Sequence, residues 1–517
     1  MRVRSCLFVL VPVAGAVALA ACGGGGGGGY SSPMMPPPPP PPAMPTVSFT
    51  SPAQGTSINF GREVTLAWSS TNATSCTGSV SSTTGGTFTG TQPTTSNSVT
   101  VVPTATGPVT YTLMCTGAGG SASATAAVTV NPNLLSTLSV AGITTIGSTA
   151  PTSGNGAGDD NPYGLAIAPV SSGLITKGDL IVCNFNSAQD TANNTQGSGT
   201  TIVGLHPTAG ASNYLIAQDA SLKGCDALAM LPDDSISAAA FSATTNPNPL
   251  VTAAGVVTDP FAADTFVSPW GEAFAPANGS NPAALYVSNF DGSIDRISLN
   301  GDAQTASTPF TQIATGFCHS GSPGAIFAPS GLTYDPSIDT LYIVDTSSYS
   351  VVAFANVSSI GAAGVVVNGQ CPTTPTITPP TPALTFSGPS ESSARVIATG
   401  GMFVAPLSAA LLPNHDLLVE NADIGVSTPS QTTNLVFEIS PLVPGGFVGQ
   451  PVQLDTGTPG ALFGIAITTD ANNNPIVYFN DDSANINTAP APAPPINVVK
   501  MLTTATSSST PMPPPGY

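Results

Sequence analysis

The sequence predicts an all-β protein whose larger part is built from repeated units of antiparallel strands. Three observations support this prediction. A short apolar strand that ends near a proline recurs along the chain, a second apolar run ending on Asn or Asp follows most copies, and a third apolar run completes most units. Runs of Val, Ile, Leu and Tyr that are bounded by turn residues are typical of β-strands.

The stretch Trp270–Leu299 shows the unit most clearly. Its first strand runs from Gly271 to Pro276, LYVSN forms the second strand, an Asp-Gly turn follows, and SIDRISL forms the third strand. The same frame fits five other anchor residues, which are Gly164, Ala227, Gly331, Ser408 and Gly464. Proline stands five residues after every anchor except Gly464, which is followed by Thr469. A repeat of this kind indicates stacked supersecondary units.

A single unit of three or four strands cannot bury its own apolar faces, whereas six units arranged radially can. The sequence therefore predicts a six-bladed β-propeller over residues 135–504. The pattern GLAxxP…LYVxN…xVxxI resembles the NHL-type six-bladed β-propellers of exported bacterial proteins. This resemblance implies the fold, while the function has to be argued from the residues of a site.

Residues 1–21 are a predicted lipoprotein signal peptide. Arg2 and Arg4 form its basic start, Leu7–Ala18 is its apolar run, and the sequence LAAC that ends at Cys22 resembles a lipobox. This resemblance implies cleavage before Cys22 and attachment of lipid to it, whereas the alternative is a plain secretory signal. The apolar run is too short to span a bilayer. Gly23 after the cysteine resembles the outer-membrane sorting pattern of Gram-negative lipoproteins.

A tether and a small domain are predicted between the signal and the propeller. Residues 22–46 are rich in Gly and Pro, which favour a flexible or extended spacer. Residues 47–132 contain alternating runs such as VTLAW and VTYTLMC, with Ser, Thr and Gly in the turns. They resemble bacterial immunoglobulin-like β-sandwiches with Trp68 in the core, although this Trp does not lie between two cysteines as it does in antibodies. We expect a spacer role here, and a disordered tail over residues 505–517.

The cysteines indicate an oxidising compartment. The chain has eight, of which Cys6 is lost with the signal and Cys22 is lipidated, so an even number of six remains. Cys76 and Cys115 are the only cysteines in the predicted sandwich. We therefore expect them to form a disulfide.

The four cysteines of the predicted propeller allow three pairings. We favour Cys183–Cys225 and Cys318–Cys371, because each of these bridges would join neighbouring blade regions. Buried free thiols are the alternative, since the geometry of a disulfide is demanding.

The charge of the chain argues against nucleic acid as a partner. Its 27 acidic residues outweigh its 8 Lys and Arg, and the formal net charge is −19. Such a surface repels phosphate backbones and anionic lipid headgroups. Membrane attachment would therefore depend on the lipid on Cys22.

No motif of familiar catalytic or metal chemistry is present in the sequence. HExxH, GxSxG, Walker and CxxC patterns are missing, and the histidines His206, His319 and His415 lie in different units. We expect these histidines to be surface or hydrogen-bonded residues. The segment that begins at Asp470 starts like a calcium loop, but Pro475 replaces the glycine of the sharp bend, so a polar turn is expected.

The residue before each anchor is the most informative position. In six-bladed propellers of the gluconolactonase type, several such positions face the central channel and supply Asn and Asp ligands to a catalytic metal. Here they are Tyr163, Asp226, Trp270, Ser330, Leu407 and Phe463. Only Asp226 could be a ligand, and calcium requires six to eight oxygens. The candidate ligand-binding residues at the channel mouth are therefore Tyr163, Asp226, Trp270 and Ser330, with no catalytic or metal-binding residue, although a channel packed shut is the alternative.

These observations predict a monomeric, extracytoplasmic lipoprotein of the outer membrane that binds a protein, peptide or glycan and has no cofactor. One alternative is a metal-dependent propeller hydrolase or lactonase with calcium in the channel, which would need three or more converging oxygen-bearing side chains. The other is a structural envelope or adhesion protein, which a filled channel with plain loops would favour.

Overall fold

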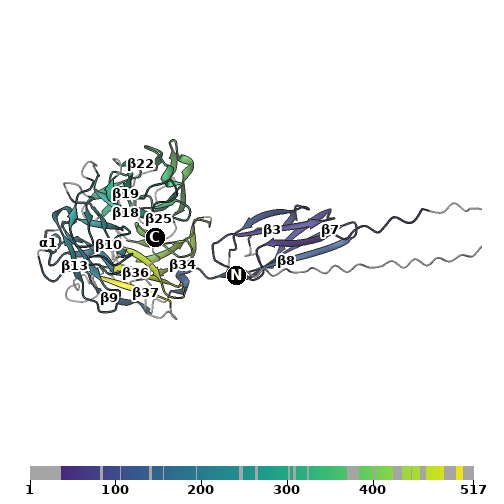
Figure 1. Ribbon diagram of the computed structural model, residues 1–517, viewed down its shortest axis with the longest axis horizontal. Coiled ribbons are helices and arrows are strands. Elements are labelled where there is room, and N and C mark those ends of the chain that lie inside the picture. Colours follow the sequence, from purple (N-terminus) through teal and green to yellow (C-terminus); the bar gives the residue numbers. More distant parts are fainter. Residues whose placement is uncertain are drawn as a thin grey trace, which may run out of the picture. The chain divides into compact units, whose positions relative to one another are not determined.

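The computed structural model describes residues 36–504 except 82–85, 105, 139–141, 155, 194, 244–247, 262–265, 301–302, 307–309, 323–324, 370–383, 401–402, 423–433, 444, 455–461 and 483–496. Its regular structure is almost entirely β-strand (Figure 1), which confirms the predicted fold class. The helices of these residues are short: α1 (Ala188–Asn193), η1 (Leu135–Thr137), η3 (Ala220–Leu222), η4 (Val357–Ser359) and η5 (Glu391–Ser393). Within the described part, none is long and apolar enough to cross a membrane.

Eight strands before residue 132 form two sheets, which together we call the N-terminal sandwich. One sheet has the order β1 (Thr46–Ser51), β3 (Val64–Thr71) and β6 (Asn97–Val101). The other has the order β2 (Thr56–Asn59), β8 (Gly120–Asn131), β7 (Gly107–Gly117), β4 (Ser75–Val80) and β5 (Gly90–Gln92). Apolar residues of both sheets share one core. Trp68 is 2% exposed there, as predicted.

The predicted disulfide between Cys76 and Cys115 is present. The two residues lie directly opposite each other on the paired strands β4 and β7, with their Cα atoms 4.1 Å apart. The bridge therefore lies within one sheet, whereas the bridge of antibody domains joins two sheets.

The remaining strands form six sheets of four or more strands within the described residues, which we call blades 1 to 6 in chain order. Blade 1 comprises β10 (Asp160–Ile167), β11 (Leu180–Asn186), β12 (Thr201–Leu205) and β13 (Tyr214–Gln218). Blade 2 comprises β14 (Cys225–Met230), β15 (Ile236–Ala240), β16 (Leu250–Val251) and β17 (Val257–Thr258). Blade 3 comprises β18 (Pro269–Ala275), β19 (Ala284–Asn289), β20 (Ile294–Asn300), β22 (Thr311–Thr315), β28 (Val365–Asn368) and β29 (Thr385–Ser387), with β21 (Ala303–Ala306) on β20.

Blades 4 to 6 repeat the same antiparallel order. Blade 4 comprises β25 (Pro329–Asp335), β26 (Thr340–Asp345), β27 (Ser350–Ala355) and β30 (Ala394–Thr399). Blade 5 comprises β31 (Pro406–Leu411), β32 (Leu417–Asn421), β33 (Leu435–Ile439) and β34 (Phe447–Gln453). Blade 6 comprises β35 (Ile465–Thr469), β36 (Pro475–Asp481), β37 (Val498–Thr503) and β9 (Thr144–Ser148). A separate hairpin is formed by β23 (Ser320–Ser322) and β24 (Ala325–Phe327).

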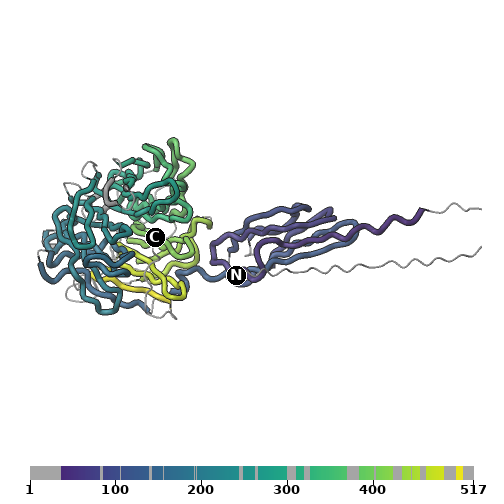
Figure 2. The backbone as a smooth tube through the Cα atoms, in the orientation of Figure 1, coloured from purple at the N-terminus to yellow at the C-terminus, as the bar shows by residue number. Residues whose placement is uncertain are grey.

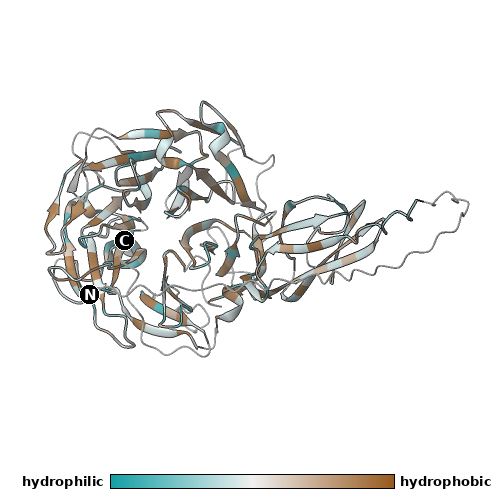
Figure 3. Cartoon of the chain, turned by 45° about the vertical axis from the view of Figure 1, so that its right-hand side comes forward, coloured by the Kyte–Doolittle hydropathy of each residue, from teal (hydrophilic) through white to brown (hydrophobic). Residues whose placement is uncertain are grey.

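The blades form a closed ring. The first strand of each blade, which we call its inner strand, contacts the inner strand of the next blade, and β35 of blade 6 contacts β10 of blade 1. Figure 3 shows the sheets around this ring, and the tube in Figure 2 follows the chain from blade to blade. The propeller architecture that the repeats predict is confirmed.

Strand β9 closes the ring. It precedes blade 1 in the chain but pairs in antiparallel fashion with β37, so the outermost strand of blade 6 comes from the start of the propeller. The two strands lie side by side in Figure 1. The Asn480 side chain of blade 6 also donates to the Tyr163 carbonyl of blade 1 at 2.8 Å.

Blades 3 and 4 are joined by main-chain pairing. Strand β28 lies between β27 and β30 of blade 4 in the sequence, but it pairs in parallel with β22 of blade 3. Its hairpin with β29 therefore extends the blade 3 sheet.

The propeller core lies between blades. Each of six clusters of buried apolar residues combines side chains from two neighbouring blades, including the pair formed by blades 6 and 1. Because the apolar face of one blade is covered by the next, no blade buries its core alone.

Candidate functional site

The inner strands surround one cavity of about 90 Å³. It is lined by the residues that precede the six anchors, which are Tyr163, Asp226, Trp270, Ser330, Leu407 and Phe463. The repeat frame therefore places all six positions around the centre of the propeller, as the sequence predicts.

The anchor glycines explain how the inner strands approach each other so closely. A Cβ atom on Gly271 would lie 1.7 Å from the Ser330 carbonyl oxygen, and one on Gly464 would lie 2.1 Å from the Tyr163 carbonyl oxygen. Each glycine thus admits the backbone of the next blade at the residue before its anchor. Glycine at this position of the motif serves packing rather than binding.

Aromatic side chains border the cavity. The rings of Tyr163 and Phe463 are stacked with centroids 4.1 Å apart, and Trp270 meets Tyr163 edge-on at 6.0 Å. Phe185 and Phe241 pack against Trp270, so the rings form a continuous buried cluster. These rings border the cavity and leave the space beside them open.

Two acidic residues from neighbouring blades also line the cavity. Asp226 lies on β14 and Glu272 lies on β18, and each is 6% exposed. The Ser237 hydroxyl donates to one Glu272 oxygen at 2.9 Å. Among the described residues, both side-chain oxygens of Asp226 and the second side-chain oxygen of Glu272 lack a hydrogen-bond partner. Such buried acceptors are costly to leave unpaired.

The protonation of this pair is shifted by its surroundings. Burial raises the pKa of Glu272 to about 8, although Ser237, Asn248 and the Ala229 backbone N–H favour the charged form. Burial raises the pKa of Asp226 well above its usual range, and the neighbouring Glu272 charge raises it further. Glu272 is therefore largely protonated near neutral pH, and the protonation equilibrium of Asp226 is shifted in the same direction.

Ser330 is occupied by structural contacts. Its hydroxyl lies 2.8 Å from the Leu407 carbonyl oxygen, 3.0 Å from the Val344 carbonyl oxygen and 2.7 Å from the Thr346 hydroxyl. It lines the cavity but ties blade 4 to blade 5.

Glu272 is the cavity residue that the sequence analysis missed, because Asp226 was taken as the only acidic candidate. Its signal was present in the repeat. The residue after the anchor is apolar in the five other units, where Leu165, Leu228, Leu332, Ala409 and Ile465 stand. A carboxyl group at an otherwise apolar position breaks the pattern and marks a functional or strained site.

A third buried carboxyl group lies behind the wall of the cavity. Glu420 on β32 accepts a hydrogen bond of 2.5 Å from Ser408, and Ser408 lines the cavity. Burial raises the pKa of Glu420 to about 8. Among the described residues, no group of three or more His, Cys, Asp or Glu side chains is arranged to hold a metal ion.

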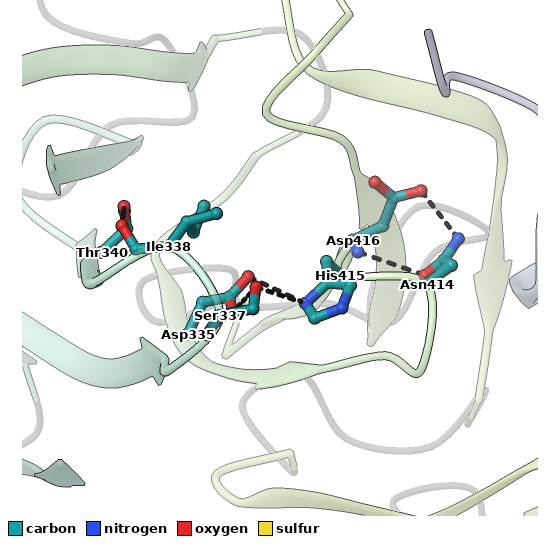
Figure 4. A network of polar contacts seen from close by, with 7 residues as sticks. All are labelled: Asp335, Ser337, Ile338, Thr340, Asn414, His415 and Asp416. Atoms are coloured by element: carbon teal, nitrogen blue, oxygen red, sulfur yellow. Dashed lines mark hydrogen bonds and ion pairs between the residues drawn. The ribbon is translucent and has the colours of Figure 1, made fainter. Parts of the chain in front are cut away.

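The network around His415 in Figure 4 is structural. His415 Nδ1 lies 3.0 Å from Asp335 Oδ2 and 3.3 Å from Ser337 Oγ, and Ser337 donates to Asp335 at 2.6 Å. Because the carboxylate and the hydroxyl meet the same ring nitrogen, they do not form the linear chain of a hydrolase triad. The contacts join the first turns of blades 4 and 5.

The other histidines and the calcium-like segment also have simple roles. His206 Nδ1 lies 2.6 Å from Asp179, and His319 is exposed with its ring near Phe290. Asp470 accepts bonds from the backbone of its own turn at 2.8 and 2.9 Å. The predicted polar turn is therefore confirmed.

The disulfide Cys183–Cys225 is present and joins blade 1 to blade 2, as predicted. Cys318 is also disulfide-bonded. Its predicted partner Cys371 lies outside the described residues, as do the predicted signal peptide, the tail and the lipid attachment residue Cys22.

No family model and no curated protein matches the sequence. Among solved structures, the chain is similar to a quinonprotein alcohol dehydrogenase-like protein from Bacteroides thetaiotaomicron, with 9% identity over 85% of this chain and 80% of that chain and a TM-score of 0.25. AofleA from Arthrobotrys oligospora has 12% identity over 66% of this chain and 88% of its own, with a TM-score of 0.35. Fibronectin(III)-like modules of Clostridium thermocellum CbhA match 17% of this chain and 98% of their own, with 6% identity and a TM-score of 0.13. At such TM-scores these likenesses do not indicate what the protein binds.

Proposed function

We propose that this protein is a lipid-anchored, extracytoplasmic binding protein whose ligand site is the central cavity of the propeller. The observation that carries the proposal is the lining of that cavity, which combines the aromatic residues Tyr163, Trp270 and Phe463 with the acidic residues Asp226 and Glu272. A few polar groups placed in an otherwise apolar hollow are typical of binding sites for small molecules or for a side chain of a peptide.

The proposed cellular location rests on separate features. The LAAC sequence at Cys22 supports lipid attachment, and Gly23 supports sorting to the outer membrane. Two disulfides within the described residues support an oxidising compartment. We further propose that the propeller is of the NHL type, that the N-terminal sandwich is an immunoglobulin-like spacer, and that the protein acts as a monomer.

Thermal unfolding in the presence of a ligand panel tests the binding role. The full mature chain is melted with glycans, short peptides, amines and alcohols, and we expect at least one class to raise the melting temperature. The gain should be lost in Asp226→Asn and kept in Glu391→Gln, which removes a charge at an exposed site. A panel without effect, or a gain that Asp226→Asn retains, would contradict the proposal.

A metal-dependent hydrolase is the second candidate function. One structural observation supports it more strongly than the sequence alone did. Glu272 adds a second carboxyl group beside Asp226, which the sequence analysis treated as a lone ligand. Metal content by mass spectrometry on the purified protein, with melting in calcium and in chelator, tests this candidate. Stoichiometric metal that is lost in Glu272→Gln would favour the hydrolase over the binding protein.

A further inference from the structure

We propose that blade 5 clamps the start of the propeller, so that a pull on the N-terminal part of the chain does not reach the ring-closing strand β9. The clamp joins three linker residues, Asn133, Leu134 and Leu135, to Glu438 of blade 5. This inference goes beyond the proposed ligand site and does not depend on it. Its basis is a set of hydrogen bonds at the point where the chain enters the propeller.

One carboxyl group holds three consecutive residues of the linker. The side-chain amide of Asn133 donates to Glu438 Oε2 at 3.0 Å. The backbone N–H of Leu135 donates to the same oxygen at 2.7 Å, and the backbone N–H of Leu134 donates to Glu438 Oε1 at 3.2 Å. Glu438 lies on β33, which has a neighbouring strand on each side in blade 5. These bonds therefore tie the linker to the interior of a sheet.

Blade 5 also fits the side chain of Asn133. This side chain is buried, and its amide donates to the Val448 carbonyl oxygen at 3.3 Å in addition to its bond with Glu438. A Cβ atom on Gly449 would lie 2.9 Å from the Asn133 amide atoms. The glycine thus leaves the space that the amide occupies, and the contact is a fitted one.

Apolar contacts continue the attachment towards blade 6. Leu135 and Leu138 are buried, and both belong to the apolar cluster that blades 5 and 6 share. Leu138 also forms an isolated antiparallel bridge with Thr504. The linker is therefore attached to two blades before the chain reaches β9.

Strand β9 is the part of the ring that the clamp shields. It is the edge strand of blade 6, and among the described strands it pairs with β37 alone. Thr144 at the start of β9 lies opposite Met501, near the end of β37. A pull on the start of β9 would therefore separate the two strands pair by pair from this end. The proposed lipid anchor is a source of such a pull, which meets Glu438 before it meets β9.

Optical tweezers apply this load to the mature chain. One tag replaces the lipid at the N-terminus, and the other follows Tyr517. Release of residues 133–148 frees sixteen residues, which extend the chain by at most about 55 Å. Unfolding of the N-terminal sandwich frees more chain than this even with its disulfide intact, so the two events differ in length. In the unaltered protein we expect the linker and β9 to leave in one step, because β9 cannot carry the load once the clamp has opened.

Two variants weaken the clamp, and a third is the matched control. Asn133→Ala removes both side-chain bonds to blade 5, and Glu438→Gln removes one of the two accepting oxygens at nearly constant size. Ser136→Ala removes a bond within the linker, which Ser136 donates to the Asn133 carbonyl oxygen. At the same load, the step should occur about tenfold faster or more in the first two variants and at an unchanged rate in the control. Circular dichroism without load checks that all three are folded.

Three results would overturn the inference. An unchanged rate in Asn133→Ala and Glu438→Gln would show that these bonds carry no load. An equally accelerated step in Ser136→Ala would show a general weakening of the linker instead of a clamp on blade 5. Two separate steps in the unaltered protein, with β9 leaving at the higher load, would show that β9 needs no shield. None of these results bears on the central cavity, so the proposed binding function stands or falls separately.

Discussion

At the scale of single residues, the close approach of the neighbouring backbone explains why glycine occupies the anchor position. Gly271→Ala would place a methyl group against the Ser330 carbonyl, which cannot move without shifting the inner strand of blade 4. We expect the free energy of unfolding to fall by about 3 kcal/mol or more. Gly361→Ala is the matched control, because nothing lies within 4 Å of its added Cβ. Urea denaturation measures both, and equal stability of the two variants would refute the packing role.

Buried carboxyl groups make stability depend on pH. Burial raises the pKa of Glu420 in the folded protein to about 8 from its usual 4.5. Between these values the folded state holds a proton that the unfolded chain has lost, so stability falls as the pH rises from about 4.5 to about 8.

Glu420→Gln tests this dependence. The substitution keeps an acceptor for Ser408 and removes the titration. We expect the variant to be more stable than the original by about 4 kcal/mol at pH 8 and by less than about 1 kcal/mol at pH 5. Thermal melting across this range, with Glu391→Gln as the surface control, measures the difference. An unchanged slope would mean that Glu420 is ionised in the folded protein.

At the scale of elements, the disulfide between β11 and β14 is the covalent link between blades 1 and 2. The double variant Cys183→Ala with Cys225→Ala should lose about 3–4 kcal/mol, because the bridge restricts a long loop of the unfolded chain. Chemical denaturation of the oxidised protein and the variant measures the loss. A loss below about 1 kcal/mol would show that the packing between these blades suffices.

The strands themselves could be predicted from the sequence, whereas their long-range pairing partners could not. The runs LYVSN, LYIVD and IVYFN became β19, β26 and β36, because local alternation and turn residues specify a strand. The pairing of β28 with β22 depends on how an insertion in blade 4 folds back, which no local pattern encodes. Glu272 was missed for a different reason. Its departure from the apolar pattern of the repeat is visible in the sequence, but it was not used to predict a cavity residue.

At the scale of the whole molecule, the ring depends on a strand from its own beginning. A chain that starts at Ala150 would lack β9, so β37 would keep its pairing with β36 but its outer edge would be unpaired. We expect its melting temperature to fall by about 10 °C or more, or the protein to aggregate through the exposed edge. A chain that starts at Asn133 keeps β9 and should melt like the propeller of the full protein. Similar melts for the two truncations would show that β9 is not needed for closure.

The position of β9 also has a consequence for export. A protein that crosses a membrane unfolded, N-terminus first, delivers β9 long before β37, which follows at the end of the propeller. The ring therefore cannot close until translocation is nearly complete. Until then, the two blades at the ends of the open arc each present an uncovered apolar face. Folding is thus tied to arrival of the last strand, and an interrupted chain would be left to the chaperones and proteases outside the cytoplasm.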